Sequence, residues 1–151
     1  MSDSIRTRDG GRIHILLVDD EPPLRRLMTY ILTQHGYLVT EAADGAAAIA
    51  AFGSGAFDLV TLDVAMPDMT GFAVCQAIRQ HSMVPVLFIS AFDAHAYRTQ
   101  ALQVGGNDYL TKPFEFTELV ARVAALLAHE RRADAPGTGQ MPTDDTRPAD
   151  I

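Results

Sequence analysis

Short apolar runs alternate with amphipathic stretches along most of the chain. The first run, IHILLV at 13–18, is followed by apolar residues spaced three and four positions apart from Leu24 to Leu32. A continuous apolar run is typical of a buried strand, and a spacing of three and four is typical of a helix with one apolar face. The pattern therefore predicts a strand followed by a helix.

This alternation recurs four times. The further predicted strands are YLVTEA at 37–42, DLVTLD at 58–63, VPVLFIS at 84–90 and DYLT at 108–111. Helical spacing follows each of them, beginning at Asp44, at Gly71, near Ala94 and before Leu119. Strands that are apolar on both faces and alternate with helices form parallel sheets with helices on both sides. The sequence therefore predicts a three-layer α/β fold.

Glycines follow three of the predicted helices, at Gly36, at Gly53 and Gly55, and at Gly105-Gly106. A residue just past the end of a helix often adopts the left-handed conformation, which glycine reaches without strain. We expect these glycines to end their helices in this way.

One folded body lies between two polar ends. We expect a single domain at residues 12–131, because the periodic apolar pattern falls there. Residues 1–11 and 132–151 have few large apolar residues, so both are expected to be disordered tails. The C-terminal end leaves two interpretations open: a stand-alone chain that acts through protein contacts, or a fragment cut at the start of a linker to another domain.

Charge and composition narrow the class of partner. The formal net charge of −7 disfavours direct binding to nucleic acid, because Lys and Arg must neutralise phosphates there. No apolar stretch approaches the roughly 18 residues of a membrane span, and the N-terminal end lacks the apolar centre of a signal peptide. We therefore expect a cytoplasmic protein without membrane contact. The single cysteine, Cys75, is interpreted as a buried apolar residue.

Four of the five predicted strands end in polar side chains. These side chains are Asp19 and Asp20, Asp63, Ser90, and Lys112. Each has a structural explanation by itself: an aspartate that starts a turn, a serine that caps a helix, and a lysine on the surface. Together they predict one polar site, because the carboxyl ends of parallel strands meet at one edge of the sheet. The second strand contributes nothing, as expected for a strand at the edge.

Three carboxylates at one place repel one another, and a divalent cation with oxygen ligands relieves this repulsion. Mg²⁺ suits a site with one or two direct carboxylates and several waters. We expect Asp20 and Asp63 to bind it directly, and Asp19 to bind it directly or through water. An Asp63 oxygen would then attack phosphorus, while Lys112 and Ser90 hold phosphoryl oxygens. The product would be an acyl phosphate on Asp63.

These motifs resemble the receiver domains of bacterial two-component response regulators. The matching segments are VDDE at 18–21, LDVAMPDMTGF at 62–72, FISA at 88–91 and NDYLTKPF at 107–114. The resemblance covers residues 12–131 and is greatest for the winged-helix (OmpR/PhoB-like) subfamily. It implies a flavodoxin-like fold of five βα units with the parallel sheet order 2-1-3-4-5.

The resemblance also implies a function and a partner. A sensor histidine kinase would transfer its phosphoryl group to Asp63, and the chain would be a phosphoacceptor in a phosphorelay rather than an enzyme. The implied Mg²⁺ ligands are Asp19, Asp20, Asp63 and the backbone carbonyl of Ala65. The peptide between Lys112 and Pro113 is expected to be cis. A conformational switch would pair the Ser90 hydroxyl with Tyr109, a ring otherwise explained as half-buried beside the fourth helix.

Two departures from the family lie beside the entrance that attacking water takes to the site. Ala65 and Phe92 stand two positions after Asp63 and Ser90, where polar residues are common in the family. We hypothesise that Phe92 shields the phosphoryl group and slows its hydrolysis.

The fourth helix, the last strand and the last helix carry charges that match the dimer face of the winged-helix subfamily. The residues are Arg98, Asp108, Glu118 and Arg122. The resemblance implies a homodimer that depends on phosphorylation, with Arg98 paired to Glu118 and Asp108 to Arg122 across the interface. The alternative is a charged face that is only solvated, since exposed ion pairs contribute about 0 to 1 kcal/mol each.

Two other classes of protein use related chemistry. A Mg²⁺-dependent phosphatase with an aspartate nucleophile needs a second aspartate two positions after the first, where this chain has Ala65. A flavin carrier of similar fold would bring the phosphate of FMN against three carboxylates. The sequence favours the receiver domain over both.

Overall fold

The computed structural model describes residues 11–134, in which five strands form one parallel sheet. The strands are β1 (His14–Val18), β2 (Leu38–Ala42), β3 (Leu59–Leu62), β4 (Val86–Ser90) and β5 (Asp108–Thr111). Their order across the sheet is β2-β1-β3-β4-β5. The flavodoxin-like order is therefore confirmed, and β2 lies at an edge of the sheet, as its lack of site residues predicted.

A helix follows each strand. The helices are α1 (Pro22–Gln34), α2 (Gly45–Ser54), α3 (Gly71–Arg79), α4 (His95–Gln103) and α5 (Phe116–Asp134). Within residues 11–134, none of them is long and apolar enough to cross a membrane. The helix α5 continues to Asp134, past the predicted end of the domain at position 131. Apart from Gly11 and residues 132–134, the tails predicted at 1–11 and 132–151 lie outside the described residues.

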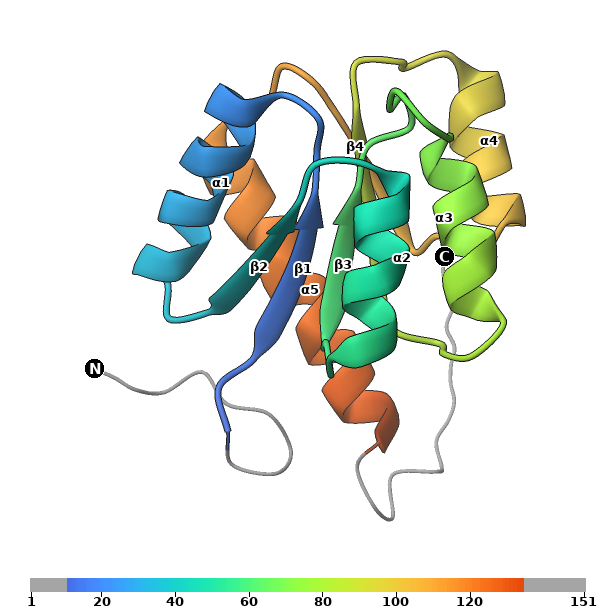
Figure 1. Cartoon of the computed structure of the whole chain (residues 1–151). Helices are drawn as coiled ribbons and strands as arrows, with labels where there is room; N and C mark the ends of the chain where they lie inside the picture. Colours follow the sequence, from blue (N-terminus) through green and yellow to red (C-terminus); the bar gives the residue numbers. More distant parts are fainter. Residues whose placement is uncertain (1–10, 135–151) are drawn as a thin grey trace, which may run out of the picture.

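The alternation of side chains along each strand produces two apolar cores. On β1, Ile15 and Leu17 face one side of the sheet, while Leu16 and Val18 face the other. The first core is completed by residues of α1 and α5, and the second by residues of α2, α3 and α4. Figure 1 shows the result, with the sheet between these two layers of helices. Both faces of the central strands are covered, and the charged residues predicted for the site follow the ends of these strands.

The predicted glycine ends are confirmed for two helices and wrong for a third. Gly36 and Gly105 have φ of 95° and 99°, in the left-handed region. Gly53 lies inside α2, and Gly55 has an extended backbone with φ of −133°. A Cβ at Gly55 would lie 2.9 Å from a ring carbon of Phe57, so close packing accounts for this glycine instead.

Candidate functional site

Side chains from the ends of three strands meet around the ammonium group of Lys112, which follows β5. Its Nζ lies 2.8 Å from Asp63 Oδ2 and 2.9 Å from Asp19 Oδ2. Asp63 follows β3 and Asp19 follows β1, so residues far apart in the sequence are brought together by the order of the strands. The strand ends that were predicted to converge do so.

Glu21 was assigned no role from the sequence, yet it belongs to the same cluster. Its Oε1 lies 3.0 Å from Lys112 Nζ, although the glutamate side chain is largely exposed. Its backbone N–H donates to Asp19 Oδ1 at 2.9 Å. The signal that could have identified it is its place directly after the two aspartates at the end of β1. Three carboxylates therefore share one lysine.

From the sequence, Asp63 could be a residue that stabilises a turn or a residue of the polar site. In the structure it is both. Its Oδ1 accepts a hydrogen bond from the backbone N–H of Ala65, two residues on, at 3.2 Å. This is the local bond by which aspartate stabilises turns. Its Oδ2 accepts from Lys112. The residue is only 6% exposed, and the two bonds together fix the direction of its side chain.

Burial sets the electrostatics of the cluster. Burial raises the pKa of Asp19, while the hydrogen bond from the Glu21 N–H and the charge of Lys112 act in the opposite direction. Burial by itself would lower the pKa of Lys112, but the hydrogen bond to Asp63 and the charges of Asp63 and Asp19 outweigh it and raise that pKa above its usual range. Lys112 is therefore a permanent cation at the centre of the site.

Three carboxylates have the geometry of a cation site. Oxygens of Asp19, Asp20 and Asp63 lie within 4.8 Å of one another. Asp19 Oδ2 is buried and has no hydrogen-bond partner among the described residues, because Lys112 approaches it outside hydrogen-bond geometry. Apart from its ion pair with Lys112, this buried oxygen accepts no hydrogen bond, and a cation with oxygen ligands would bind it directly. The donor set fits Mg²⁺.

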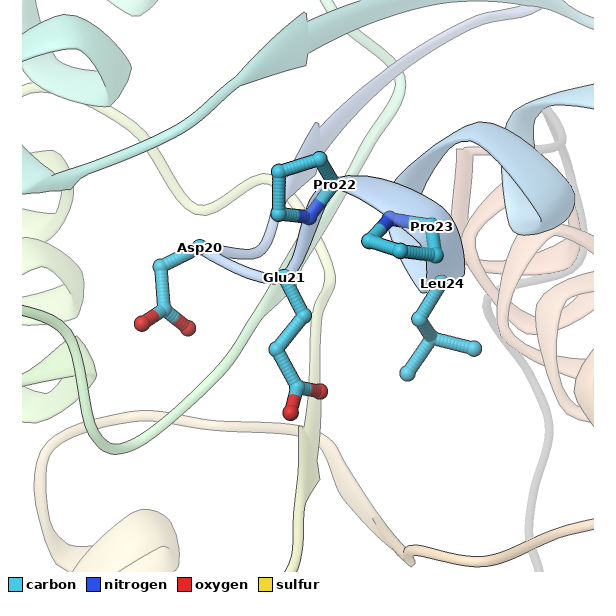
Figure 2. Close-up of a pocket in the computed structure, with 5 residues that line it drawn as sticks. All are labelled: Asp20, Glu21, Pro22, Pro23 and Leu24. Carbon is cyan, nitrogen blue, oxygen red and sulfur yellow. The ribbon is translucent and has the colours of Figure 1, made fainter.

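A pocket of about 220 Å³ opens above the cluster. Its lining residues are Asp20, Glu21, Asp63, Ala65, Ser90, Ala91, Phe92 and Lys112. A second pocket lies beside the start of α1 and shares two acidic residues with the first. Figure 2 shows that the carboxylates of Asp20 and Glu21 point to the same side of the chain, away from the ring of Pro22. Both residues also line the first pocket, where Glu21 pairs with Lys112.

Ser90 and Tyr109 are connected through the backbone of Phe92. The backbone N–H of Phe92 donates to Ser90 Oγ at 3.2 Å, and the Tyr109 hydroxyl donates to the Phe92 carbonyl oxygen. Tyr109 is 5% exposed, more buried than its alternative explanation required. Burial raises its pKa, against an opposing effect of the Ser90 side chain. Ser90 caps no helix here, since the N-cap of α4 is Ala94.

The peptide between Lys112 and Pro113 is cis, as the resemblance implied.

The charged residues predicted for a dimer face lie on α4, β5 and α5 and have partners within the chain. Arg122 pairs with Asp108 at 2.9 Å and with Glu118 at 3.3 Å. Arg98 donates to Thr111 Oγ1 at 2.6 Å and lies 5.0 Å from the centre of the Tyr109 ring.

Comparisons with known proteins agree with this site. The sequence matches the family described as "Response regulator receiver domain" over residues 15–124. The probable transcriptional regulatory protein TcrX of Mycobacterium tuberculosis is 43% identical over 124 residues, which is 82% of this chain and 53% of TcrX. Curated relatives at about 40% identity are regulators of the winged-helix (OmpR/PhoB-like) type. The chain spans about half the length of these relatives.

Solved structures that resemble this chain are also response regulators. The receiver domain of the Francisella response regulator 1452 has a TM-score of 0.75 and 29% identity, covering 79% of this chain and 99% of that one. The response regulator TrrA of Thermotoga maritima, solved in complex with Mg²⁺-BeF, has a TM-score of 0.69 and 35% identity, covering 76% of this chain and 98% of that one. The family match, the sheet order and the acidic cluster with its lysine point to one conclusion. The chain belongs to the response regulator receiver domains of two-component systems, which are phosphoacceptor signalling domains and not classical enzymes.

Proposed function

We propose that Asp63 accepts a phosphoryl group from the phosphohistidine of a sensor histidine kinase. The observation that carries this proposal is the pair of bonds that fix Asp63, one from Lys112 and one from the Ala65 N–H, at the wall of an open pocket. A carboxylate held in one direction beside a cation is ready to attack an incoming phosphorus atom. The bond between phosphorus and the donor nitrogen breaks as the bond to an Asp63 oxygen forms.

Mg²⁺ would be held by Asp19, Asp20, Asp63 and the backbone carbonyl of Ala65. The proximity of the three carboxylates and the buried Asp19 oxygen that accepts no hydrogen bond support this ligand set. When bound, Mg²⁺ supplies positive charge that offsets the repulsion between the acidic cluster and an anionic phosphoryl group. The solved complex of TrrA with Mg²⁺-BeF adds support from a relative.

Lys112 and Ser90 would bind the transferred group. The Lys112 ammonium already contacts Asp63 Oδ2, so it can also donate to a phosphoryl oxygen attached to that carboxylate. Ser90 Oγ accepts a hydrogen bond from Phe92, which leaves the hydroxyl proton for a phosphoryl oxygen. Movement of Ser90 toward the phosphoryl group would alter the Phe92 backbone that Tyr109 also binds. This linkage supports Ser90 and Tyr109 as the conformational switch.

Labelling of the wild-type chain tests this function. Incubation with acetyl phosphate and Mg²⁺ should add one phosphoryl group, detected by intact mass and located to the segment that contains Asp63 by fragmentation. A chain that stays unlabelled while other receiver domains are labelled in parallel, or that is labelled elsewhere, would overturn the proposal. In the cell, we propose a cytoplasmic location and a sensor histidine kinase as the donor, on the basis of family membership.

Phe92 is expected to lengthen the lifetime of the phosphoryl group. Phe92 lines the pocket, and its ring stacks on that of Tyr97 with ring centres 4.8 Å apart. Because Phe92→Glu would place a carboxylate able to orient water there, we expect hydrolysis to accelerate about tenfold, which corresponds to about 1.4 kcal/mol. The phosphoryl half-life measured after removal of acetyl phosphate tests this. Phe92→Leu, which keeps apolar cover, is the control, and an unchanged or longer half-life in Phe92→Glu would refute the shielding role.

Phosphorylation is proposed to promote a homodimer through the α4-β5-α5 face. Supporting the proposal, Arg98, Asp108, Glu118 and Arg122 lie on these three elements, and Leu102 of α4 is 65% exposed. Arg122 would have to give up its ion pairs within the chain to form pairs with the second copy. Because exposed ion pairs are weak, dimerisation should be slight without phosphate. Shifting an equilibrium from about 1:99 to 99:1 requires about 5.5 kcal/mol of differential stabilisation.

Sedimentation with and without beryllofluoride and Mg²⁺ tests the dimer. We expect the mass to double with the phosphoryl mimic. Arg98→Glu should prevent this, and the exchange Arg98→Glu with Glu118→Arg should restore it, because the proposed pair is re-formed with reversed charges. A mass that does not change on addition of the mimic would exclude the dimer.

A further inference from the structure

Asp68, in the loop between β3 and α3, binds the start of a different helix, α2. Its Oδ1 accepts from the backbone N–H of Gly45 at 2.9 Å, and its Oδ2 accepts from that of Ala46 at 2.8 Å. The first N–H groups of a helix have no partner within the helix, and a carboxylate satisfies them well. Both oxygens of Asp68 are used in this way. The loop is therefore tied to α2 by a charged side chain.

Close packing beside Asp68 keeps the loop against α2. Gly45 is buried, and a Cβ at this position would lie 2.2 Å from Cγ of Met69, the residue after Asp68. The helices α2 and α3 on either side of the loop are neighbours in the layer of helices in front of the sheet (Figure 1). The loop therefore packs closely against α2, at a position where only the absence of a side chain at Gly45 leaves enough space.

The same loop carries the residues of the phosphoacceptor site. Asp63 begins it, and Ala65, whose backbone carbonyl is a proposed Mg²⁺ ligand, lies three residues before Asp68. Pro67 lies between Ala65 and Asp68, and its ring fixes its own φ. The backbone between these two residues therefore has fewer accessible conformations. At the far end, the Gly71 N–H donates to the Val64 carbonyl at 2.8 Å. Asp68 is accordingly the point at which α2 restrains this short loop between its two ends.

We propose that Asp68 is a positioning residue, which holds the loop on α2 so that the backbone of Ala65 keeps its place in the wall of the pocket that Asp20 and Asp63 also line. This proposal rests on the proposed function of the site. The two hydrogen bonds also lower the pKa of Asp68, consistent with a carboxylate that is bound in its charged form. Asp68 does not line the pocket of Asp63 and Lys112, so its effect must pass through the backbone of residues 65–67.

Asp44 provides a matched control, because it caps the same helix without binding the loop. Its Oδ1 accepts from the Ala47 N–H at 2.8 Å. Asp44→Ala and Asp68→Ala should both lower the melting temperature, since each removes a cap of α2. Only Asp68→Ala should weaken Mg²⁺ binding, by about tenfold, as is typical when a group that orients a metal ligand is removed. Asp68→Asn keeps one acceptor oxygen and should lose less affinity than Asp68→Ala.

The measurement is a titration of the full chain with Mg²⁺ alone, followed by the backbone amide shifts of residues 63–70 in NMR spectra, with melting recorded in parallel. Loss of affinity in Asp68→Ala, with Asp44→Ala within about twofold of wild type, would support the proposal. Equal affinity in Asp68→Ala and wild type, or equal losses in Asp68→Ala and Asp44→Ala, would overturn it. A wild-type chain that binds no Mg²⁺ would overturn the proposed cation site itself, and is thereby distinguished from failure of this inference alone.

Discussion

Asp63→Asn is expected to abolish labelling of the chain by acetyl phosphate and Mg²⁺. Asparagine has nearly the same shape but offers an amide in place of the carboxylate oxygen that forms the new bond to phosphorus. The fold should persist, because Lys112 keeps its ion pairs with Asp19 and Glu21. Removing one of several clustered carboxylates also relieves repulsion. Intact mass after incubation measures the result, and circular dichroism verifies that the variant is folded.

Asp93→Asn is the matched control for this prediction. Asp93 is exposed, follows β4 close to the site, and does not line the pocket of Asp63 and Lys112. The control has the same change in charge and in chemistry, so it should be labelled as fast as wild type. Labelling of a folded Asp63→Asn chain at the wild-type level would mean that another residue accepts the phosphoryl group.

The convergence of the site residues was predictable because it depends on the topology of the sheet more than on the exact bounds of each strand. Asp19, Asp63 and Lys112 each stand directly after a run that is apolar enough to be a buried strand. A parallel sheet brings such positions to one edge whatever the exact length of each strand. The strand ends in fact differed slightly from prediction: β4 begins at Val86 rather than position 84, and β3 stops at Leu62. Neither difference moves a site residue off the edge.

The partners of the site residues were less predictable, because they depend on loop conformation. Glu21 reaches Lys112 only because the chain turns sharply between β1 and α1. Asp68 binds amides 23 and 22 positions earlier in the chain, at a contact that no local pattern encodes. The Tyr109 hydroxyl binds the Phe92 backbone, whose position depends on the loop before α4. Sequence periodicity specifies strands and helices, whereas these contacts require the tertiary arrangement.

Gly71→Ala is expected to destabilise the domain by about 3 kcal/mol, toward the upper end of the cost of overpacking. A Cβ at Gly71 would lie 2.0 Å from the backbone carbonyl oxygen of Asp63. No side chain can rotate to relieve this contact, because the atom that is struck belongs to the backbone at the end of β3. Either α3 or the Asp63 peptide must move. Urea unfolding, followed by circular dichroism, measures the loss as a lower midpoint.

Gly53→Ala is the control with the opposite expected sign. A Cβ at Gly53 meets nothing within 4 Å, and the residue lies in α2, where alanine is favoured over glycine. This variant should gain about 0.5 kcal/mol. Since both changes add the same methyl group to a helix, the difference between them isolates the approach of α3 to Asp63. Equal stabilities of the two variants would mean that this backbone contact relaxes freely, and that the position of the phosphoacceptor peptide is not set by the start of α3.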